Sequence, residues 1–305
     1  MKIAVFGSGA VGGYFGGRLA ASGEDVTFIA RGEHLAALRR DGLTITSPKG
    51  DLRLPVKATD TPAEVGPVDI VLFTVKMYDV EGAAAKLAPM VGPETAIVTM
   101  QNGVDVVSMV ARQVGLEHVA GGTAYVVAVV DRPGHVRHTV ADRLIFGEPD
   151  GVRSPRLERF EAAGRKAGFS ASASTAVHVD LWTKFVRLST WSGMTTVTRC
   201  SMGIIRSDPA LMAMMMAAFD EAVAVGRARG IDFAPDIRDS TLAMINGFPE
   251  QSKSSMLEDL ERGRRLELPW LSGAVARLGR ESGVPTPVHQ FITTVLTPLT
   301  GGSRG

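Results

Sequence analysis

Residues 2–23, KIAVFGSGAVGGYFGGRLAASG, carry the clearest structural signal in this chain. The apolar run Lys2–Phe6 predicts a short strand, and residues 10–22 predict a helix that ends at Gly23. Between strand and helix, residues 7–12 match the pattern G-x-G-x-x-G. A glycine loop in this position is typical of a dinucleotide-binding unit, because it brings a helix N-terminus close to the phosphates of the ligand.

The three glycines of this loop have different expected roles. Gly7 makes the tight turn, Gly9 lets the backbone approach a pyrophosphate, and Gly12 lets the helix pack closely on the strand. A glycine-rich turn without a ligand is the alternative. We predict that the loop binds a dinucleotide through Gly7, Ser8, Gly9, Ala10, Val11 and Gly12.

Strands and helices alternate through the first half of the chain. The expected strands cover 25–30, 69–75 and 96–100, and the expected helices cover 33–40, 79–90, 104–114 and 154–168. The segments LTITSP and LRLPVKATD predict a hairpin excursion, and short strands separated by turns after residue 118 predict an antiparallel extension of the sheet. From residue 177 on, only helical periodicity is found, over 177–199, 208–229, 235–246, 253–262, 266–283 and 287–298.

This order predicts an α/β Rossmann-type N-terminal domain, residues 1–174, followed by an all-α C-terminal domain, residues 175–305. Two domains are the usual expectation for a chain of 305 residues. The contents of 45% hydrophobic and 21% charged residues are typical of a globular protein and exclude global disorder. With a net charge of +1 and no long Lys/Arg run, we expect no nucleic-acid partner.

Composition also indicates the cellular setting. A single cysteine, Cys200, excludes an intramolecular disulfide framework and suits a reducing cytosol. Apolar runs such as residues 211–219 are too short to cross a membrane, and the chain starts directly with the first strand, so we expect a cytoplasmic protein. The six histidines are scattered without ligand spacing, which predicts no metal site. The Met-rich run 211–219 could serve a core or a homodimer interface equally well.

The end of the second strand indicates which dinucleotide is bound. NAD enzymes place an acidic residue there, on the ribose 2′-hydroxyl, but this chain has Arg31, 19 residues beyond Gly12. A guanidinium can hold a 2′-phosphate through two parallel hydrogen bonds. We therefore predict NADP(H) as the cofactor, with an ordinary surface arginine as the alternative.

Further polar side chains follow other predicted strands. Lys76 comes after FTV, and Gln101 and Asn102 come after the strand that ends in TM. Each alone could be a solvated strand end or a turn. Ligands of open α/β sheets bind at the carboxyl ends of strands, so together they predict further binding residues.

The stretch DLWTKFVRLSTWSGMTT, residues 180–196, places Lys184 in an apolar helix. A long aliphatic stem that carries the ammonium to water is the simplest reading of Lys184 alone. Arg187, three residues on, could help to bind an anionic substrate or be solvated.

With these residues in view, the chain resembles the ketopantoate reductase family, whose members reduce the 2-oxo group of ketopantoate with NADPH to give pantoate for pantothenate and coenzyme A synthesis. The resemblance covers nearly the full length and rests on GSGAVGGYFG, FIAR, FTVK, MQNGV, LWTKFV and SSMLEDLERGRRLE. It implies a Rossmann-type N-domain and an α-helical C-domain similar to that of 6-phosphogluconate dehydrogenases.

By position, the resemblance implies a role for each matched residue. Arg31 would bind the 2′-phosphate, Lys76 the phosphate-ribose region, and Asn102 would lie near the nicotinamide ribose and the substrate. Lys184 matches the general acid, and Glu267 matches the glutamate that contacts substrate and lysine.

The substrate carboxylate is the third group that the family binds. Ser255 matches the serine that holds it, although SSMLEDLE alone would be a helix start with Ser254 or Ser255 as its N-cap. A lysine in an apolar cleft suits the chemistry, because desolvation lowers its pKa towards the range where it can give a proton near neutral pH.

The chain departs from the family at positions that usually carry asparagine. Leu188 and Ser192 stand four and eight residues after the lysine, and Ser272 stands five residues after the glutamate. Ser192 keeps a short hydroxyl that we still expect to face the substrate. Either the substrate is a 2-oxo acid other than ketopantoate, or ketopantoate is kept and other groups such as Thr190 and Thr196 hold its hydroxyl.

Three other classes of function remain open at this point. One is a dinucleotide-binding sensor without catalysis. Another is a related NAD(P)-dependent dehydrogenase, similar to 6-phosphogluconate dehydrogenases, that acts on hydroxy acids or imines in the oxidative direction. The last is a structural module that needs no cofactor.

Overall fold

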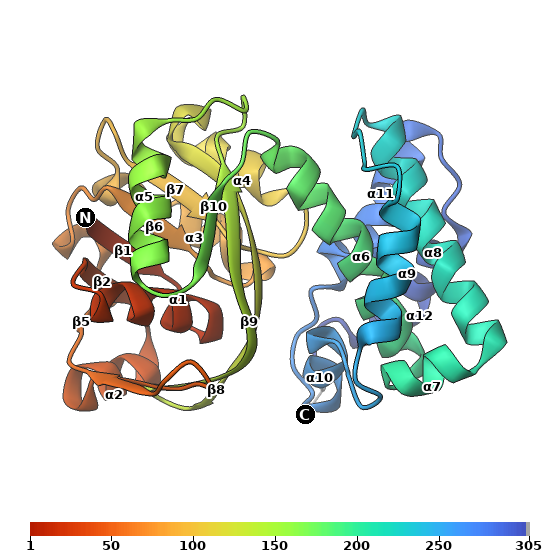
Figure 1. Ribbon diagram of the computed structural model, residues 1–305, viewed down its shortest axis with the longest axis horizontal. Coiled ribbons are helices and arrows are strands. Elements are labelled where there is room, and N and C mark those ends of the chain that lie inside the picture. Colours follow the sequence, from red (N-terminus) through yellow and green to blue (C-terminus); the bar gives the residue numbers. More distant parts are fainter. Residues whose placement is uncertain (303–305) are drawn as a thin grey trace. The chain divides into compact units, whose positions relative to one another are not determined.

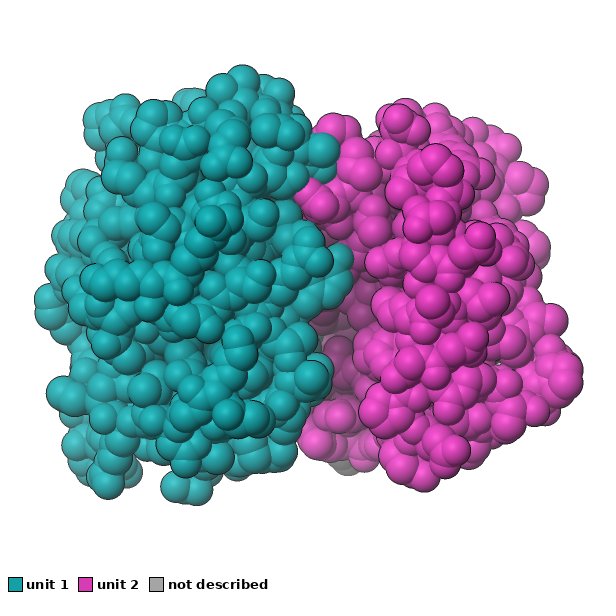
Figure 2. All heavy atoms as spheres, viewed as in Figure 1, with its two compact units in different colours: residues 1–101, 105–177 teal, residues 102–104, 178–305 magenta. Residues whose placement is uncertain are grey.

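The computed structural model describes residues 1–302. The chain divides into two compact units, shown in different colours in Figure 2. Unit 1 comprises Met1–Gln101 and Asp105–Val177, and unit 2 comprises Asn102–Val104 and the chain from His178 onward. Each unit has a hydrophobic core of its own. The predicted limits of 1–174 and 175–305 for the domains stay a prediction.

Unit 1 is built on a ten-stranded mixed sheet (Figure 1) in which nine strands follow the order β4-β3-β9-β8-β7-β6-β1-β2-β5 and β10 pairs with β9. The strands β7, β6, β1, β2 and β5 run parallel to one another. Ile3 in β1 lies opposite Val26 in β2 and Ile70 in β6, and all three are buried. The strand bounds are β1 Lys2–Phe6, β2 Asp25–Ile29, β3 Leu43–Thr46, β4 Leu52–Leu54, β5 Lys57–Thr59, β6 Ile70–Phe73, β7 Ala96–Thr99, β8 Val119–Arg132, β9 His135–Gly147 and β10 Ser170–Ala173.

The antiparallel part of the sheet differs in detail from the expectation. The expected short strands after residue 118 are two long strands, β8 and β9, which pair antiparallel. Ala141 interrupts their register and has a φ of 59°, so β9 continues through a β-bulge where a turn was predicted. The expected hairpin forms between β3 and β4, but the segment after Pro55 leaves it and β5 pairs with β2.

The helices of unit 1 are α1 Ala10–Ala21, α2 Gly32–Asp41, α3 Val80–Ala84, α4 Val106–Val114 and α5 Pro155–Lys166, with short 3-10 helices η1 Pro62–Glu64, η2 Met77–Asp79, η3 Ala88–Met90 and η4 Leu116–His118. The expected helix over 79–90 is therefore broken into η2, α3 and η3. Helix α1 packs closely on the sheet, because a Cβ at Gly16 would lie 2.5 Å from a Val5 methyl group.

Unit 2 is helical throughout the part that the structure describes, as expected. Its elements are α6 Val177–Thr198, α7 Met202–Ser207, α8 Pro209–Ala228, α9 Ile237–Gly247, α10 Ser255–Glu261, η5 Leu268–Trp270, α11 Ser272–Ser282, α12 Pro287–Leu296 and η6 Thr297–Leu299. The sequence-based fold class, a Rossmann-type domain followed by an all-α domain, is confirmed.

The sequence predicted that the apolar run 211–219 is too short to cross a membrane, but this run lies within the longer helix α8. With 20 residues and a mean hydropathy of 1.4, it is long and apolar enough to cross a membrane by length and composition. The core helix of a soluble protein meets the same criteria. Met215, Ala218 and Phe219 on α8 are buried, and Met215 and Phe219 belong to the core of unit 2.

Candidate active site

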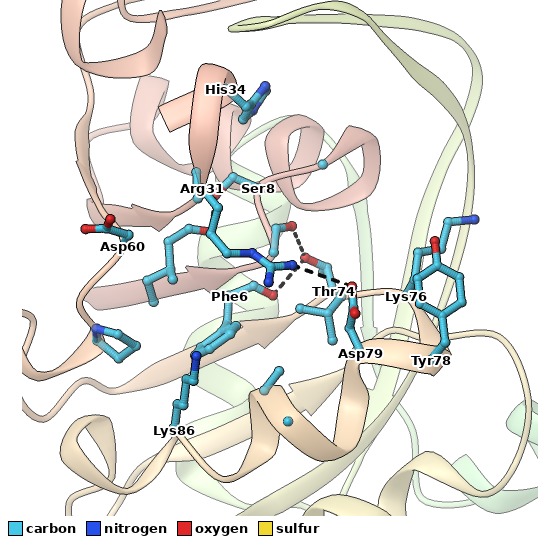
Figure 3. Close-up of a pocket in the computed structure, with 18 of the residues that line it drawn as sticks. Phe6, Ser8, Arg31, His34, Asp60, Thr74, Lys76, Tyr78, Asp79 and Lys86 are labelled. Atoms are coloured by element: carbon cyan, nitrogen blue, oxygen red, sulfur yellow. Dashed lines mark hydrogen bonds and ion pairs between the residues drawn. The ribbon is translucent and has the colours of Figure 1, made fainter. Parts of the chain in front are cut away.

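A pocket of about 650 Å³ lies in unit 1 at the carboxyl ends of β1, β2 and β6 (Figure 3). Three predicted binding regions meet there, since the glycine loop with Gly7, Ser8 and Gly9, Arg31, and Lys76 all line the pocket. Parallel neighbours end at one edge of a sheet, which explains why segments that are distant in the sequence converge at this point. Of the other predicted loop residues, Ala10 and Val11 begin α1 and are partly buried, and Gly12 is buried.

The glycine loop has the geometry that its sequence predicts. Gly7 has a φ of +102°, and a Cβ there would lie 2.7 Å from the Val75 backbone nitrogen. A Cβ at Gly12 would lie 2.5 Å from the hydroxyl oxygen of Thr74. At Gly9, by contrast, a Cβ would meet no atom of residues 1–302 within 4 Å, so this backbone borders open space.

Two hydroxyl groups hold the glycine loop in place. The Thr74 hydroxyl donates to the carbonyl of Gly7 at 2.5 Å, and the buried Ser8 hydroxyl donates to the carbonyl of Ile29 at 3.0 Å. These bonds tie the loop to the ends of β6 and β2. The role of Thr74 was missed from the sequence, where it stood only as part of the strand before Lys76.

Arg31 extends over the pocket from the N-cap position of α2 and forms an ion pair with Asp79 (Figure 3). The Arg31 Nη2 atom lies 3.6 Å from the Asp79 Oδ2 atom, and the two side chains are 78% and 43% exposed. Asp79, Asp60, His34 and Lys86 also line the pocket, and the sequence did not identify them as site residues. Desolvation lowers the pKa of His34, whose Nδ1 accepts a hydrogen bond from the Gly134 backbone.

Unit 2 contains a second group of predicted residues. The side-chain amide of Asn102 donates to the carboxylate of Glu267 at 3.4 Å, and Glu267 is only 6% exposed. Lys184 on α6 is partly buried. Burial lowers the pKa of the Lys184 ammonium from its ordinary value of 10.5 to about 8, while the charge of Glu267 acts to raise it. The structure thus brings together three residues that are far apart in the sequence.

The two serines at the start of α10 have separate roles. Ser254 is buried, caps α10 by accepting from the Leu257 backbone at 3.1 Å, and contacts the Thr195 hydroxyl at 2.7 Å. Ser255, the predicted carboxylate ligand, is the first residue of α10 and is exposed. Because the cap belongs to Ser254, the hydroxyl of Ser255 is not needed for that purpose.

The positions that depart from the family pattern lie along α6 and α11. Ser192 is buried and donates to the carbonyl of Leu188 at 2.6 Å, so its proton is used within the helix. Ser272 is buried, and its hydroxyl lies within 2.6 Å of the place where Gly193 would carry a Cβ. A larger side chain at residue 272 would therefore meet α6.

Arg187 has a different environment from Lys184. Its guanidinium donates to the hydroxyls of Thr241 at 3.0 Å and Ser240 at 2.9 Å. These bonds anchor α6 to α9, which gives Arg187 a structural role. Within residues 1–302, no group of three or more His, Cys, Asp or Glu side chains is arranged to hold a metal ion.

Family comparisons agree with the two-part architecture. The family described as "Ketopantoate reductase PanE/ApbA" matches residues 3–151, and "Ketopantoate reductase PanE/ApbA C terminal" matches residues 176–300. A 2-dehydropantoate 2-reductase of Mesorhizobium japonicum is 32% identical to this chain, with 98% of each chain covered.

Solved structures show the same similarity. The crystal structure of 2-dehydropantoate 2-reductase from Geobacter metallireducens has a TM-score of 0.92 at 30% identity, covering 98% of this chain and all of its own. A D-mandelate dehydrogenase solved with NADH and anilino(oxo)acetate has a TM-score of 0.90 at 21% identity, with 98% of each chain covered. At this identity the second likeness shows the fold alone.

Proposed function

Because this chain belongs to the ketopantoate reductase family and is an oxidoreductase, we propose that it reduces a 2-oxo acid to the 2-hydroxy acid with NADPH, with 2-dehydropantoate as the first candidate substrate. The observation that carries the proposal is the group formed by Lys184, Glu267 and Asn102 in unit 2. A lysine with a pKa of about 8 beside a carboxylate is suited to give a proton to a carbonyl oxygen at neutral pH.

The pocket of unit 1 fits a dinucleotide. Its glycine loop opens α1, whose first backbone N–H groups can bind phosphate, and the open space at Gly9 permits a close approach. When bound, a nicotinamide dinucleotide supplies the hydride. Arg31 supports NADP(H), since its exposed guanidinium can turn towards a 2′-phosphate. Lys76, which follows β6 and lines the pocket, is proposed to contact the phosphate-ribose region.

In the proposed reaction, Lys184 protonates the substrate oxygen as negative charge develops on it. Its ammonium also stabilises that charge before the proton moves. Glu267 keeps Lys184 protonated near neutral pH, because its charge raises the lysine pKa against the effect of burial. The hydrogen bond from Asn102 fixes the Glu267 carboxylate, and the exposed hydroxyl of Ser255 is proposed to bind the substrate carboxylate.

The substrate is the part of the proposal with the most alternatives. The names of the curated relatives support 2-dehydropantoate. Against it, Leu188 offers no hydrogen bond on the helical face of Lys184, and the proton of Ser192 is held by the Leu188 carbonyl. A site without partners for a substrate hydroxyl does not favour a hydroxylated substrate over one that lacks the hydroxyl. A second candidate is therefore a 2-oxo acid with an apolar side chain.

The single cysteine supports a cytoplasmic location as part of this proposal. That the Met-rich run 211–219 forms a homodimer interface stays a prediction.

A substrate panel tests the proposed function. The purified protein is assayed with NADPH and NADH on ketopantoate, its analogue without the hydroxyl, and an aryl 2-oxo acid. We expect turnover with NADPH and a loss of several orders of magnitude in kcat in Lys184→Ala. Lys166→Ala, at an exposed site on α5, is the control for removing a lysine. Full activity of Lys184→Ala would show that Lys184 is not the acid, and nucleotide binding without turnover of any 2-oxo acid would favour a sensor.

A further inference from the structure

The ion pair between Arg31 and Asp79 places a carboxylate at the point where the proposed function puts the 2′-phosphate of NADP(H). Asp79 ends the 3-10 helix η2, and its backbone N–H donates to the carbonyl of Lys76 at 2.9 Å. Its position at the pocket edge is therefore set by the backbone. Figure 3 shows the Arg31 guanidinium reaching down to this carboxylate from the opposite side of the pocket.

We propose that Asp79 is a specificity-determining residue that limits the preference of this enzyme for NADPH over NADH. The inference rests on the proposed function, because it concerns the same cofactor pocket. A 2′-phosphate carries nearly two negative charges, so Asp79 both repels it and competes with it for Arg31. The same carboxylate can accept a hydrogen bond from the ribose 2′-hydroxyl of NADH, which is the role that acidic residues have in NAD enzymes.

The exposure of the pair allows both cofactors to bind. Exposed ion pairs contribute little stability, and Arg31 is 78% exposed, so its guanidinium can leave Asp79 for a phosphate. The Asp79 carboxylate, fixed at the end of η2, then stays close to that phosphate. Lys86, which follows α3 and also lines the pocket, adds a second cation that can attract the 2′-phosphate. The pocket thus combines features of NAD and NADP sites.

Asp60 provides a matched comparison within the same pocket. It also lines the pocket, but it pairs with Arg39, whose Nη2 atom lies 3.8 Å from the Asp60 Oδ1 atom. Asp60→Asn therefore removes the same charge from the pocket without freeing Arg31. A difference between Asp79→Asn and Asp60→Asn separates competition for Arg31 from a change in net charge.

The test measures binding of two cofactor fragments by calorimetry, without turnover. The probes are adenosine 2′,5′-bisphosphate and adenosine 5′-monophosphate, and the quantity compared is the ratio of their affinities. In the wild type we expect the bisphosphate to bind only several-fold more tightly. Asp79→Asn should raise the ratio about tenfold, mainly at low salt, and Asp60→Asn should raise it clearly less. Arg31→Ala should bring the ratio close to one.

The outcomes separate this inference from the proposed function. If Asp79→Asn leaves the ratio unchanged, or if Asp60→Asn raises it equally, Asp79 does not compete for Arg31 and the inference is wrong while NADPH-dependent reduction stands. If neither nucleotide binds the wild type, the proposed cofactor site is wrong and the inference falls with it. A ratio in the wild type already above a thousandfold would also overturn it, since no limit on NADPH preference would then exist.

Discussion

The Asn102 amide donates a hydrogen bond to the Glu267 carboxylate, although 165 positions separate the two residues in the sequence. Asn102 lies three residues after the end of β7 yet belongs to unit 2, together with Gly103 and Val104. A Cβ at Gly103 would lie 3.0 Å from the Trp270 carbonyl, so this short segment packs against the turn that carries Glu267. Within unit 2, the segment of Asn102 therefore holds the carboxylate whose charge raises the pKa of Lys184.

The pH dependence of the reaction should follow Lys184. In the reductive direction the protonated lysine is the active form, so kcat/KM should be level below pH 8 and fall about tenfold per pH unit above it. In the oxidative direction the neutral lysine acts as a base, and the rate should rise through the same pH. Initial rates between pH 6 and 10 in both directions test this. A flat reductive profile up to pH 10 would contradict a lysine acid with a pKa of about 8.

Glu267→Gln should shift the pH profile of kcat/KM to lower pH. Removing the carboxylate charge removes the influence that raises the Lys184 pKa, so the fall in kcat/KM should begin at a lower pH. The amide keeps the size of the side chain and can still bond to Asn102. Glu261→Gln, a change at an exposed carboxylate that pairs with Lys253, is the control. A shift of the fall towards higher pH in Glu267→Gln would be inconsistent with this role.

The burial of the Lys184 ammonium should also lower the free energy of unfolding at neutral pH. Between about pH 8 and 10.5 the unfolded chain binds more protons at this residue than the folded chain, so the free energy of unfolding should rise with pH in that window. Lys184→Met removes the buried charge and should stabilise the protein at pH 7 by about 1–3 kcal/mol, at the expense of activity. Chemical denaturation at pH 7 and pH 10 measures this, and the gain from the substitution should be smaller at pH 10.

Alanine at two glycines of the loop should have different effects, lowering thermal stability at Gly12 and weakening cofactor binding at Gly9. Gly12→Ala places a methyl group 2.5 Å from the Gly7 carbonyl oxygen, so α1 must move and Tm should fall. Gly9→Ala meets no atom of residues 1–302 within 4 Å, so Tm should be nearly unchanged. Its methyl group would occupy the space proposed for the pyrophosphate, and NADPH binding should weaken at least tenfold. Tight NADPH binding by Gly9→Ala would place the pyrophosphate elsewhere.

Local patterns explain which parts of the molecule could be predicted. The glycine loop follows from backbone geometry, and the two-part architecture follows from the change in periodicity near residue 177. The family resemblance is confirmed by both family matches. Ala141 could not be recognised as a bulge, because alanine carries no sequence signal for a positive φ.

Asp79 could not be assigned a role from the sequence, because its partner is an exposed arginine from another strand end. The same limit applies to Thr74, because nothing in the sequence indicates that its hydroxyl donates a hydrogen bond to the carbonyl of Gly7. Contacts between distant segments depend on sheet order and register, which neither motif nor composition specifies.

The last prediction concerns the hydrogen-bonding groups that the family pattern leads one to expect on α6. Leu188 stands one helical turn after Lys184 and is partly buried, so Leu188→Asn would place an amide on the same helical face. If ketopantoate is a poor substrate because its hydroxyl lacks a partner, Leu188→Asn should raise kcat/KM for ketopantoate by about 10- to 100-fold relative to the analogue without the hydroxyl. Leu188→Met, which keeps an apolar side chain of similar volume, is the control. An equal effect of Leu188→Asn on both substrates would mean that residue 188 does not contact the substrate hydroxyl, and discrimination would then depend on other groups such as the Thr196 hydroxyl, which is buried without a hydrogen-bond partner among the described residues.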